Sequence, residues 1–510
     1  MPFETTLSVE PQAPTGHDNE PRPRPEYPRP QLWRPEWMNL NGFWDFAFDD
    51  LDVGLHDEWY TGRSGFGRRI RVPFKFEADQ SSIGDRGFHE RVWYRREIRI
   101  PPSWSEQQRI LLHFGAVDYR ATVWVNGMVV GAHEGGHTPF TCDITCALND
   151  GRGVLVVRAE DPPTDRYIPR GKQHWEERPA SIFYARTTGI WQTVWMEPVP
   201  ESYISHVKIT PLIDGTVKFA FKIAHPEAGQ FVKVVIREDT RFLANSISVA
   251  SGPLAATALF VDHPKFWSPE SPHLYEATLE LHTPEGAVDT VETYFGYRSI
   301  STQDGKVLLN GNPYYLKTAL DQGYWPQSNL TPPSDEAIQA DIRMTKELGF
   351  NGVRKHQKVE DPRYLYWADK MGLLVSGEMA NAYQFNDDSV ARVTREWMEV
   401  IGRDYNHPCI ALRNELKDTG ITITALMPGP TETNFFHRAG MDDTKVGSSE
   451  KDDAAEVAAE GCKALMAGKD KVIAGSFKNS LMGGLGAHIL SDTVKAELHR
   501  KQAEPQPAKK

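Results

Sequence analysis

The chain has 510 residues, 40% of them hydrophobic and 25% charged, which is enough for roughly three or four soluble domains with separate cores. Its net charge of −12 gives no support to nucleic acid or an anionic membrane as a partner. No run approaches the ~18 apolar residues that a membrane span needs, so no membrane association is predicted. The first residues lack the basic and apolar regions of a signal peptide, which favours a cytoplasmic protein.

Cysteine use excludes two further classes of protein. The four cysteines are too few and too scattered for a disulfide framework. Cys142 and Cys146 lie four residues apart, but no second pair or histidine cluster matches them, so no metal site is predicted. The 14 tryptophans and 17 tyrosines are more informative, because aromatic-rich β domains often bind sugars, although packing in the core explains most single tryptophans.

The first part of the chain predicts a leader followed by an all-β domain. Residues 1–31 are rich in proline and poor in large apolar side chains, which predicts a disordered leader. From 32 to 199 short alternating segments are separated by turn residues. One of them alternates from Ala121 and turns at Asn126-Gly127, a hairpin signal, and others cover 153–158 and 190–195. We predict a β-sandwich for 32–199.

A second β domain and a change of period follow. Alternating segments within 200–298 predict a small immunoglobulin-like β-sandwich. Helical spacing then alternates with short apolar runs, which is typical of a parallel α/β unit. The predicted helices cover 334–348, 361–371 and 389–404, and the predicted strands cover 351–356 and 372–378.

Short motifs appear in a fixed order along these regions. They are Trp124-Val-Asn-Gly127, Gly189-Ile-Trp-Gln192, Phe266-Trp-Ser-Pro269, Phe295-Gly-Tyr-Arg298, Gly349-Phe-Asn-Gly-Val-Arg354 and Asn406-His-Pro408. The series resembles glycoside hydrolase family 2, which includes β-galactosidases, β-glucuronidases and β-mannosidases. The resemblance covers about 32–410. It implies a jelly-roll-like sugar-binding domain at 32–199, an immunoglobulin-like domain at 200–298 and the N-terminal half of a TIM barrel at 299–411.

The resemblance also implies a retaining β-glycosidase that uses two carboxylates about 5.5 Å apart, one as acid/base and one as nucleophile. The acid/base would be a Glu after an Asn, roughly a dozen residues beyond the Asn-His-Pro motif. The pair Asn414-Glu415 lies closer to Asn406 than this spacing requires. Because side chains alternate along a strand, this difference in spacing would direct the carboxylate of Glu415 away from the centre of the barrel. Leu412 and Leu416 also have helical spacing. We therefore expect no catalytic residue here, with Glu415 as a remote candidate.

Three residues at predicted strand ends are candidates for sugar binding. By resemblance these are Arg354, His356 and Glu378, since such folds carry functional groups at the carboxyl ends of the barrel strands. Their alternative role is a polar network that only positions loops. His356 is the less certain contact, because the run from Arg354 to Gln357 departs from the Ser-His-Tyr-Pro-like run that is more frequent in the family.

The sequence changes character beyond residue 411. The segment from Leu412 to Thr431 resembles the C-terminal third of short-chain dehydrogenases, including the turn Pro428-Gly429-Pro430-Thr431. A predicted helix at 454–468 and a predicted strand at 471–475 fit the same Rossmann-like fold. We found neither a Gly-rich phosphate turn nor a catalytic Tyr-x-x-x-Lys in place, so no cofactor is predicted. The predicted fragment covers 412–500, and a disordered tail covers 501–510.

The sequence as a whole therefore predicts a family 2 glycosidase scaffold fused to a dehydrogenase fragment. We expect a protein of carbohydrate metabolism with a β-glycoside ligand, whose catalysis is incomplete because the barrel is truncated. Two alternatives stay open: a non-catalytic carbohydrate-binding protein, and an NADP-dependent oxidoreductase. The junction near 411 is either a real fusion or an error of the gene model. The sugar, the linkage and the oligomeric state are not predicted.

Overall fold

The computed structural model describes residues 21–104, 108–413, 425–428, 451–466 and 471–474. The chain divides into two compact units. The larger one consists of Met1–Arg178, Tyr184–Ser301 and Leu308–Glu415, and the smaller one of Pro179–Phe183, Thr302–Val307 and Leu416–Lys510. No helix in the described ranges combines the length and the apolar character that crossing a membrane requires.

The first domain of the larger unit is a β-sandwich, as predicted. Its six-stranded sheet has the order β3-β2-β4-β10-β7-β8, and its four-stranded sheet has the order β1-β12-β5-β9. Buried side chains from both sheets, such as Trp44 and Tyr94 of one and Leu112 and Met196 of the other, share one core. The strands are β1 (Met38–Asn39), β2 (Gly42–Phe48), β3 (Arg68–Val72), β4 (Arg91–Arg99), β5 (Arg109–Phe114), β7 (Arg120–Val125), β8 (Met128–Glu134), β9 (Phe140–Asp143), β10 (Arg152–Glu160) and β12 (Val194–Val199).

Local turn chemistry explains two details of this domain. The predicted hairpin is confirmed: β7 and β8 pair across Asn126 and Gly127, whose φ angles of 51° and 80° are the left-handed values that such a turn requires. The predicted strand 190–195 is interrupted between Ile190 and Val194. Gly189–Ile190 (β11) pairs with Val117–Asp118 (β6), and β12 begins only at Val194, because the fully buried Trp191 between them bonds to the loop at Ala116.

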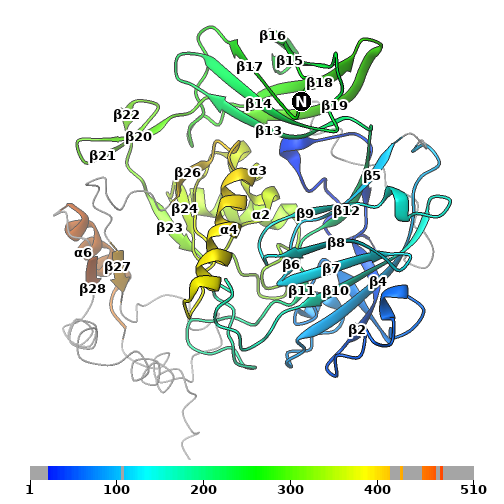
Figure 1. Ribbon diagram of the computed structural model, residues 1–510. Coiled ribbons are helices and arrows are strands. Elements are labelled where there is room, and N and C mark those ends of the chain that lie inside the picture. Colours follow the sequence, from blue (N-terminus) through cyan, green and yellow to red (C-terminus); the bar gives the residue numbers. More distant parts are fainter. Residues whose placement is uncertain (1–20, 105–107, 414–424, 429–450, 467–470, 475–510) are drawn as a thin grey trace, which may run out of the picture. The chain divides into compact units, whose positions relative to one another are not determined.

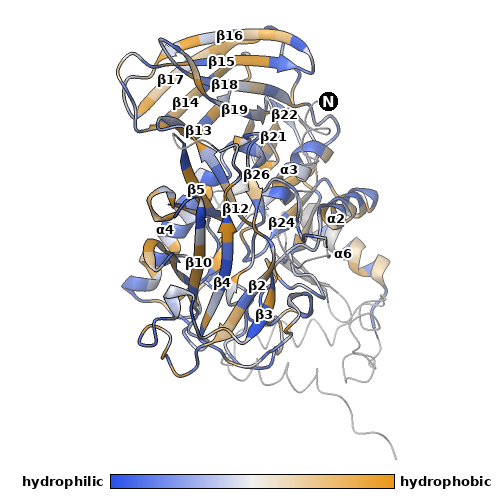
Figure 2. Ribbon diagram, turned by 90° about the vertical axis from the view of Figure 1, so that its right-hand side faces the viewer, coloured by the Kyte–Doolittle hydropathy of each residue, from blue (hydrophilic) through white to orange (hydrophobic). Residues whose placement is uncertain are grey.

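The second domain is a smaller β-sandwich whose sheets have the orders β13-β14-β17 and β16-β15-β18-β19. In β14 burial alternates residue by residue, so one face packs in the core and the other faces solvent. Figure 2 shows this alternation of hydrophobic and hydrophilic residues along the strands. The strands are β13 (Tyr203–Pro211), β14 (Thr216–Ala224), β15 (Phe231–Glu238), β16 (Arg241–Val249), β17 (Leu254–Phe260), β18 (Tyr275–Thr283) and β19 (Gly286–Phe295).

Four parallel strands in sequential order, β23-β24-β25-β26, form the third region, with helices α2, α3 and α4 beside them (Figure 1). The predicted alternation of helices and strands is confirmed, whereas β23 was not predicted. Three short strands, β20 (Ile300–Gln303), β21 (Lys306–Leu309) and β22 (Asn312–Pro313), precede it. Its elements are β23 (Thr318–Asp321), α2 (Asp335–Glu347), β24 (Gly352–Lys355), α3 (Pro362–Met371), β25 (Leu374–Gly377), α4 (Asp387–Arg403) and β26 (Ile410–Arg413).

Side-chain caps fix where these helices begin. The hydroxyl of Ser334 accepts a hydrogen bond from the amide of Ala337, and Asn386 forms a reciprocal capping box with Ser389 at the start of α4. At the other end of α3, Gly372 has φ 74°, and a Cβ there would lie 2.4 Å from the carbonyl oxygen of Pro269, so only glycine fits.

Two predictions on this part of the chain need correction. Leu412 and Arg413, where helical spacing predicted a helix, pair with Ser376 and Gly377 of β25 instead, so ladder hydrogen bonding overrides the spacing. Residues 21–31, predicted to belong to a disordered leader, are packed, with Tyr27 fully buried. Composition misled this prediction, because the segment buries its few large side chains against other domains.

The smaller unit contains a parallel pair of strands, β27 (Ala425–Pro428) and β28 (Lys471–Ala474), with helix α6 (Ala454–Met466) between them in the chain. The helix and the second strand lie where the sequence predicted them. A Rossmann-like fragment stays a prediction, since most of 412–500 and the tail 501–510 lie outside the described residues.

Candidate functional site

The structure brings three of the predicted site residues together at the carboxyl ends of β24 and β25. An Nη2 atom of Arg354 lies 2.5 Å from Oε2 of Glu378, and Nε2 of His356 lies 3.8 Å from Oε1 of the same carboxylate. Arg354 and His356 are two residues apart, so their side chains leave the strand on the same side. Glu415 lies outside the described residues.

A chain of hydrogen bonds orients His356. The hydroxyl of Tyr184 donates to Oε1 of Gln322 at 2.6 Å, which leaves the amide nitrogen of Gln322 facing Nδ1 of His356 at 3.4 Å. If Nδ1 accepts this contact, the imidazole proton is on Nε2, the nitrogen that faces Glu378. Burial lowers the pKa of His356 below its ordinary value, and the carboxylate of Glu378 partly opposes this effect.

The first sandwich contributes to this site through a long loop that joins β10 to β11. Gly171 lies so close to the strand-end loop that a Cβ there would be 2.2 Å from the carbonyl oxygen of Gln357. The buried Lys172 is near enough to Glu378 for their charges to interact, and burial lowers the pKa of its ammonium group. Tyr184, from the same loop, stacks on Tyr324 with ring centroids 3.9 Å apart. The site is therefore built from two domains.

A buried ion cluster lies on the opposite side of β24. Nζ of Lys355 lies 2.5 Å from Asp321 and 2.9 Å from Glu360, and Nζ of Lys358 lies 3.0 Å from Glu360. Burial alone would lower the pKa of Lys355, but its two carboxylate partners raise it well above its usual value. The two lysines in turn outweigh burial at Glu360 and lower its pKa to about 2. These ion pairs connect the end of β24 to Asp321 and Glu360.

Sequence reasoning missed most of the supporting residues. Lys172, Tyr184 and Gln322 carry no motif of their own, and the first two lie about 180 residues away from Arg354 in the chain. Lys355 could have been found, because a lysine at a buried position of a short strand requires a partner. No comparable signal marks Gln322.

One group of three possible metal ligands occurs within the described residues: Asp369, His407 and Cys409. Their polar atoms are already hydrogen-bonded. Asp369 accepts from the hydroxyl of Tyr294 at 2.9 Å and from the amide of Cys409 at 2.8 Å, and it lies 2.5 Å from Nδ1 of His407. Burial also raises the pKa of the Cys409 thiol well above its usual value. The donor set fits a hydrogen-bonded junction between the second sandwich and α3 better than a metal site.

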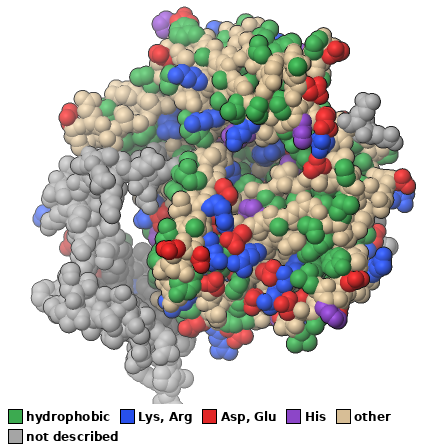
Figure 3. Space-filling view, in the orientation of Figure 1, with side chains coloured by type: hydrophobic (Ala, Val, Ile, Leu, Met, Phe, Trp, Pro, Cys, Tyr) green, Lys and Arg blue, Asp and Glu red, His purple; other side chains and the backbone are tan. Residues whose placement is uncertain are grey.

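On the face of the molecule in Figure 3, the charges are mixed in sign. Figure 3 shows lysine and arginine side chains interspersed with aspartate and glutamate on the face in view. A single basic stripe, which nucleic-acid binding requires, is not seen on that face.

Two regions of the chain match models of known domains. Residues 37–175 match the sugar binding domain of glycosyl hydrolases family 2. Residues 202–298 match the model described as glycosyl hydrolases family 2. Two regions of the chain are thus similar to domains of this family. The two matched regions coincide with the two sandwiches. The predicted resemblance to glycoside hydrolase family 2 is therefore confirmed for the domains within 32–298.

Curated relatives similar to the chain are β-glucuronidases. It is 24% identical over 447 residues to the enzyme of Rattus norvegicus, covering 80% of this chain and 67% of the relative. It is 25% identical over 429 residues to that of Canis lupus familiaris (76% and 64%) and 26% identical over 420 residues to that of Paenibacillus borealis (76% and 68%). The chain spans about two thirds of the length of these relatives.

Solved structures show the same fold. A β-glucuronidase from Ruminococcus gnavus in complex with uronic deoxynojirimycin matches with a TM-score of 0.64 at 22% identity, covering 76% of this chain and 69% of that one. A β-glucuronidase from an uncultured Clostridium sp. matches with a TM-score of 0.62 at 25% identity, covering 74% and 66%.

Proposed function

We propose that the chain is a glycosidase-type protein of carbohydrate metabolism that binds a β-linked sugar acid at the carboxyl ends of β24 and β25. The observation that carries the proposal is the cluster of Arg354, His356 and Glu378 beneath the loop of the first sandwich. The β-glucuronidase similarity supports a uronic acid as the sugar. Arginine and lysine near the site suit a carboxylate, and Glu378 can accept hydrogen bonds from sugar hydroxyls.

We further infer that the chain binds this ligand without hydrolysing it efficiently. A retaining glycosidase needs one carboxyl group that can be protonated and a second that is free to attack. At the described strand ends, Glu378 is paired with Arg354 and Asp321 with Lys355, so both carboxylates suit orientation of the sugar rather than attack. Hydrolysis would therefore depend on Glu415 or on residues beyond it.

The test combines binding with turnover on the full-length chain. We expect D-glucuronic acid to bind in isothermal titration calorimetry more tightly than D-glucose, and Arg354→Ala to weaken binding roughly tenfold or more, which is the loss of one charge-assisted hydrogen bond. We expect little or no release of nitrophenol from nitrophenyl β-D-glucuronide.

Two outcomes would contradict these proposals separately. Equal affinity for the two sugars, unchanged by Arg354→Ala, would remove the binding proposal. Rapid turnover that disappears in Glu415→Gln would make Glu415 the acid/base and remove the proposal of incomplete catalysis. The matched control is Glu285→Gln, an exposed glutamate of the second sandwich, which should change neither quantity.

Oxidoreductase activity has weaker support. The parallel pair β27 and β28 with α6 agrees with a dehydrogenase-type fragment. Titration with NADPH would decide the point, and we expect no change in NADPH fluorescence, because no Gly-rich turn is found in the sequence to hold the pyrophosphate.

A further inference from the structure

Two aromatic rings stack beside the candidate site, one from each of the domains that build it. Tyr184 belongs to the loop between β10 and β11 of the first sandwich, and Tyr324 follows the end of β23. Their ring centroids lie 3.9 Å apart, and the ring planes differ by 13°. Because β23 pairs with β24, the stack stands beside the strand end that carries Arg354 and His356.

Hydrogen bonds fix the position of Tyr184. Its amide donates to the carbonyl of Lys172 at 2.8 Å, and its carbonyl accepts from the amide of His174 at 3.0 Å. Its hydroxyl donates to Oε1 of Gln322 at 2.6 Å, and Nε2 of Gln322 lies 3.4 Å from Nδ1 of His356. One side chain thus separates the phenol ring from the imidazole, a distance that a group attached to a bound sugar can span.

One face of the Tyr184 ring is covered by Tyr324, and much of the rest is accessible. The residue is 37% exposed, and Tyr324 is the one aromatic ring that it contacts within the described part of the chain. Because the hydroxyl is already hydrogen-bonded, the surface that is left for a ligand is mainly apolar ring. A rigid ring held at the edge of a binding site is suited to stacking on a flat group.

A second pair of rings reaches the same strand end. The ring centroids of Trp175 and Tyr383 lie 5.1 Å apart, and the guanidinium of Arg166 lies 4.5 Å from the centroid of the Trp175 ring. The hydroxyl of Tyr383 donates at 2.9 Å to Gln357, the residue after His356. Both rings are partly exposed. Aromatic surface therefore borders the candidate site from the sandwich loop and from the segment after β25.

These contacts favour a flat apolar ring over a second sugar as the group attached to the bound sugar acid. A second sugar needs hydrogen bonds for its hydroxyl groups, but the hydroxyls of Tyr184 and Tyr383 already donate to glutamine side chains. An aromatic ring needs no such partner and would bury its face on Tyr184. A short alkyl group would bury less apolar area at the same place.

We propose that Tyr184 selects an aryl group on the anomeric oxygen of the bound sugar, so that the ligands are aryl β-glycosides of a sugar acid. The inference rests on the sugar-acid binding proposed above and adds the nature of the attached group. Tyr184 acts by direct contact with this group, and Tyr324 supports the ring from behind.

The test compares two ligands that differ only in the attached group. The full-length chain is titrated calorimetrically with methyl β-D-thioglucuronide and with phenyl β-D-thioglucuronide, whose sulfur resists hydrolysis. We expect the phenyl compound to bind about threefold to tenfold more tightly, which is the effect of one aromatic contact. The ratio of the two affinities is the measured quantity, because a general loss of sugar binding cancels in it.

Two variants of Tyr184 separate the ring from its hydroxyl. Tyr184→Leu should reduce the preference for the phenyl compound to less than about twofold, whereas Tyr184→Phe keeps the ring and should retain it. The matched control is Tyr315→Leu, at an exposed tyrosine that precedes β23 and so lies at the amino end of the strand. It should keep the full preference, and unfolding temperatures show whether each variant folds.

The outcomes separate this inference from the function on which it rests. Equal affinity for the methyl and phenyl compounds would overturn aryl selection alone, provided that methyl β-D-thioglucuronide still binds more tightly than methyl β-D-thioglucoside. A phenyl preference that persists in Tyr184→Leu would overturn the role of this residue. Equal affinity for the methyl glucuronide and the methyl glucoside would remove the sugar-acid proposal, and this inference with it.

Discussion

Glu378 is the residue that connects the side chains of the candidate site, because it faces two cationic side chains and a histidine. Its carboxylate pairs with Arg354, lies close to Nε2 of His356 and interacts with the charge of Lys172. The carboxylate opposes the lowering of the pKa values of His356 and Lys172 that burial causes. Replacing it should therefore change the protonation of His356 and Lys172 and not only one contact.

We therefore predict that Glu378→Gln lowers the pKa of His356 further below its ordinary value. Burial already lowers this pKa, and the carboxylate is the main group that opposes burial, so removing the negative charge leaves the imidazolium less stable. Titration of the imidazole signals by NMR measures the change, with Glu285→Gln as the control. An unchanged pKa would mean that the carboxylate does not face the imidazole in solution.

Helix α4 docks on the first sandwich with an acidic residue in the contact. Glu396 is fully buried, accepts a hydrogen bond from the amide of His137 at 3.3 Å and leaves its second oxygen without a hydrogen bond. Burial raises the pKa of Glu396 well above its ordinary value, and the nearby Asp118 adds to this effect. The contact of the helix with the sandwich thus includes a carboxyl group whose protonated form is favoured by burial.

Glu396→Gln should stabilise the protein at alkaline pH and have little effect near pH 4. The folded-state pKa lies above the unfolded one, so ionisation costs stability progressively as the pH rises above the unfolded value. An amide avoids this cost. A gain of about 1 kcal/mol would raise the unfolding temperature by roughly 1 °C in a chain of this size.

Unfolding temperatures measured from pH 4 to pH 9 test this prediction. Glu285 is exposed and lies in the second sandwich, so Glu285→Gln should not reproduce the pH-dependent gain. Equal gains at both ends of the pH range would show that Glu396 is ionised in the folded protein.

At the level of elements, sequence patterns were reliable where a local cause acts. The turn at Asn126-Gly127 needs a left-handed backbone, and the helix that begins after Ser334 needs a capping oxygen. Residue types that meet these needs are found in the sequence, so both features could be predicted from it. Leu412 and Arg413 were misread because pairing with β25 decides their conformation. The contribution of the loop between β10 and β11 to the site could not be predicted from the sequence, because the contact of Gly171 with Gln357 depends on how two domains pack.

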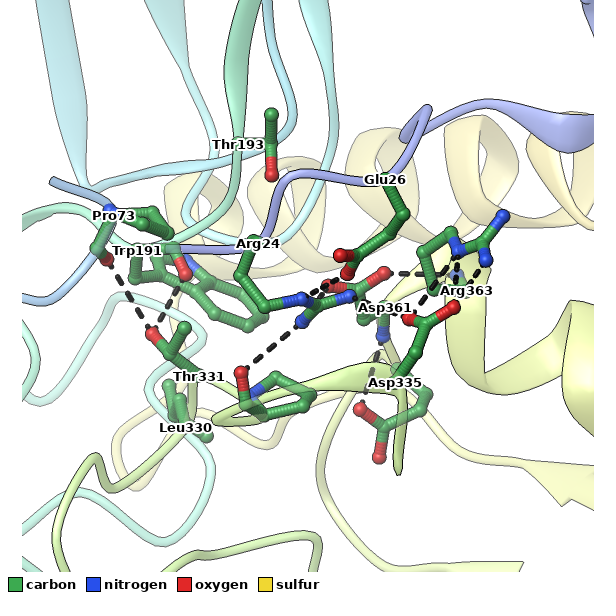
Figure 4. A network of polar contacts seen from close by, with 12 residues as sticks. Arg24, Glu26, Pro73, Trp191, Thr193, Leu330, Thr331, Asp335, Asp361 and Arg363 are labelled. Carbon is green, nitrogen blue, oxygen red and sulfur yellow. Dashed lines mark hydrogen bonds and ion pairs between the residues drawn. The ribbon is translucent and has the colours of Figure 1, made fainter. Parts of the chain in front are cut away.

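On the scale of the larger unit, the N-terminal segment joins domains that are distant in the chain. Arg24 is almost fully buried, lies 3.4 Å from Asp335 and 3.2 Å from Asp361, and donates to the carbonyl of Pro332 (Figure 4). Its backbone carbonyl also accepts from Asn39 of the first sandwich. One arginine therefore connects the start of α2, the start of α3 and the sandwich.

Arg24→Ala should destabilise the protein by about 3–5 kcal/mol, since it leaves buried carboxylates without their cation. Urea unfolding followed by tryptophan fluorescence measures the loss, and exposed Arg86→Ala should stay within about 0.5 kcal/mol of the unaltered chain. A separate early transition would indicate that the parallel sheet has detached from the sandwich. A loss as small as that of Arg86→Ala would show that the ion pairs of Arg24 do not hold the domains together.

The close approach of Gly171 to Gln357 has a consequence for how such proteins can diversify. Because backbone touches backbone there, neither domain can be exchanged for a homologous one unless glycine is kept and the loop has the same length. Recombination at the domain boundary would more often damage the candidate site than create a new specificity. New specificity is therefore more accessible through point changes at Lys172 or Tyr184, which leave the backbone contact intact.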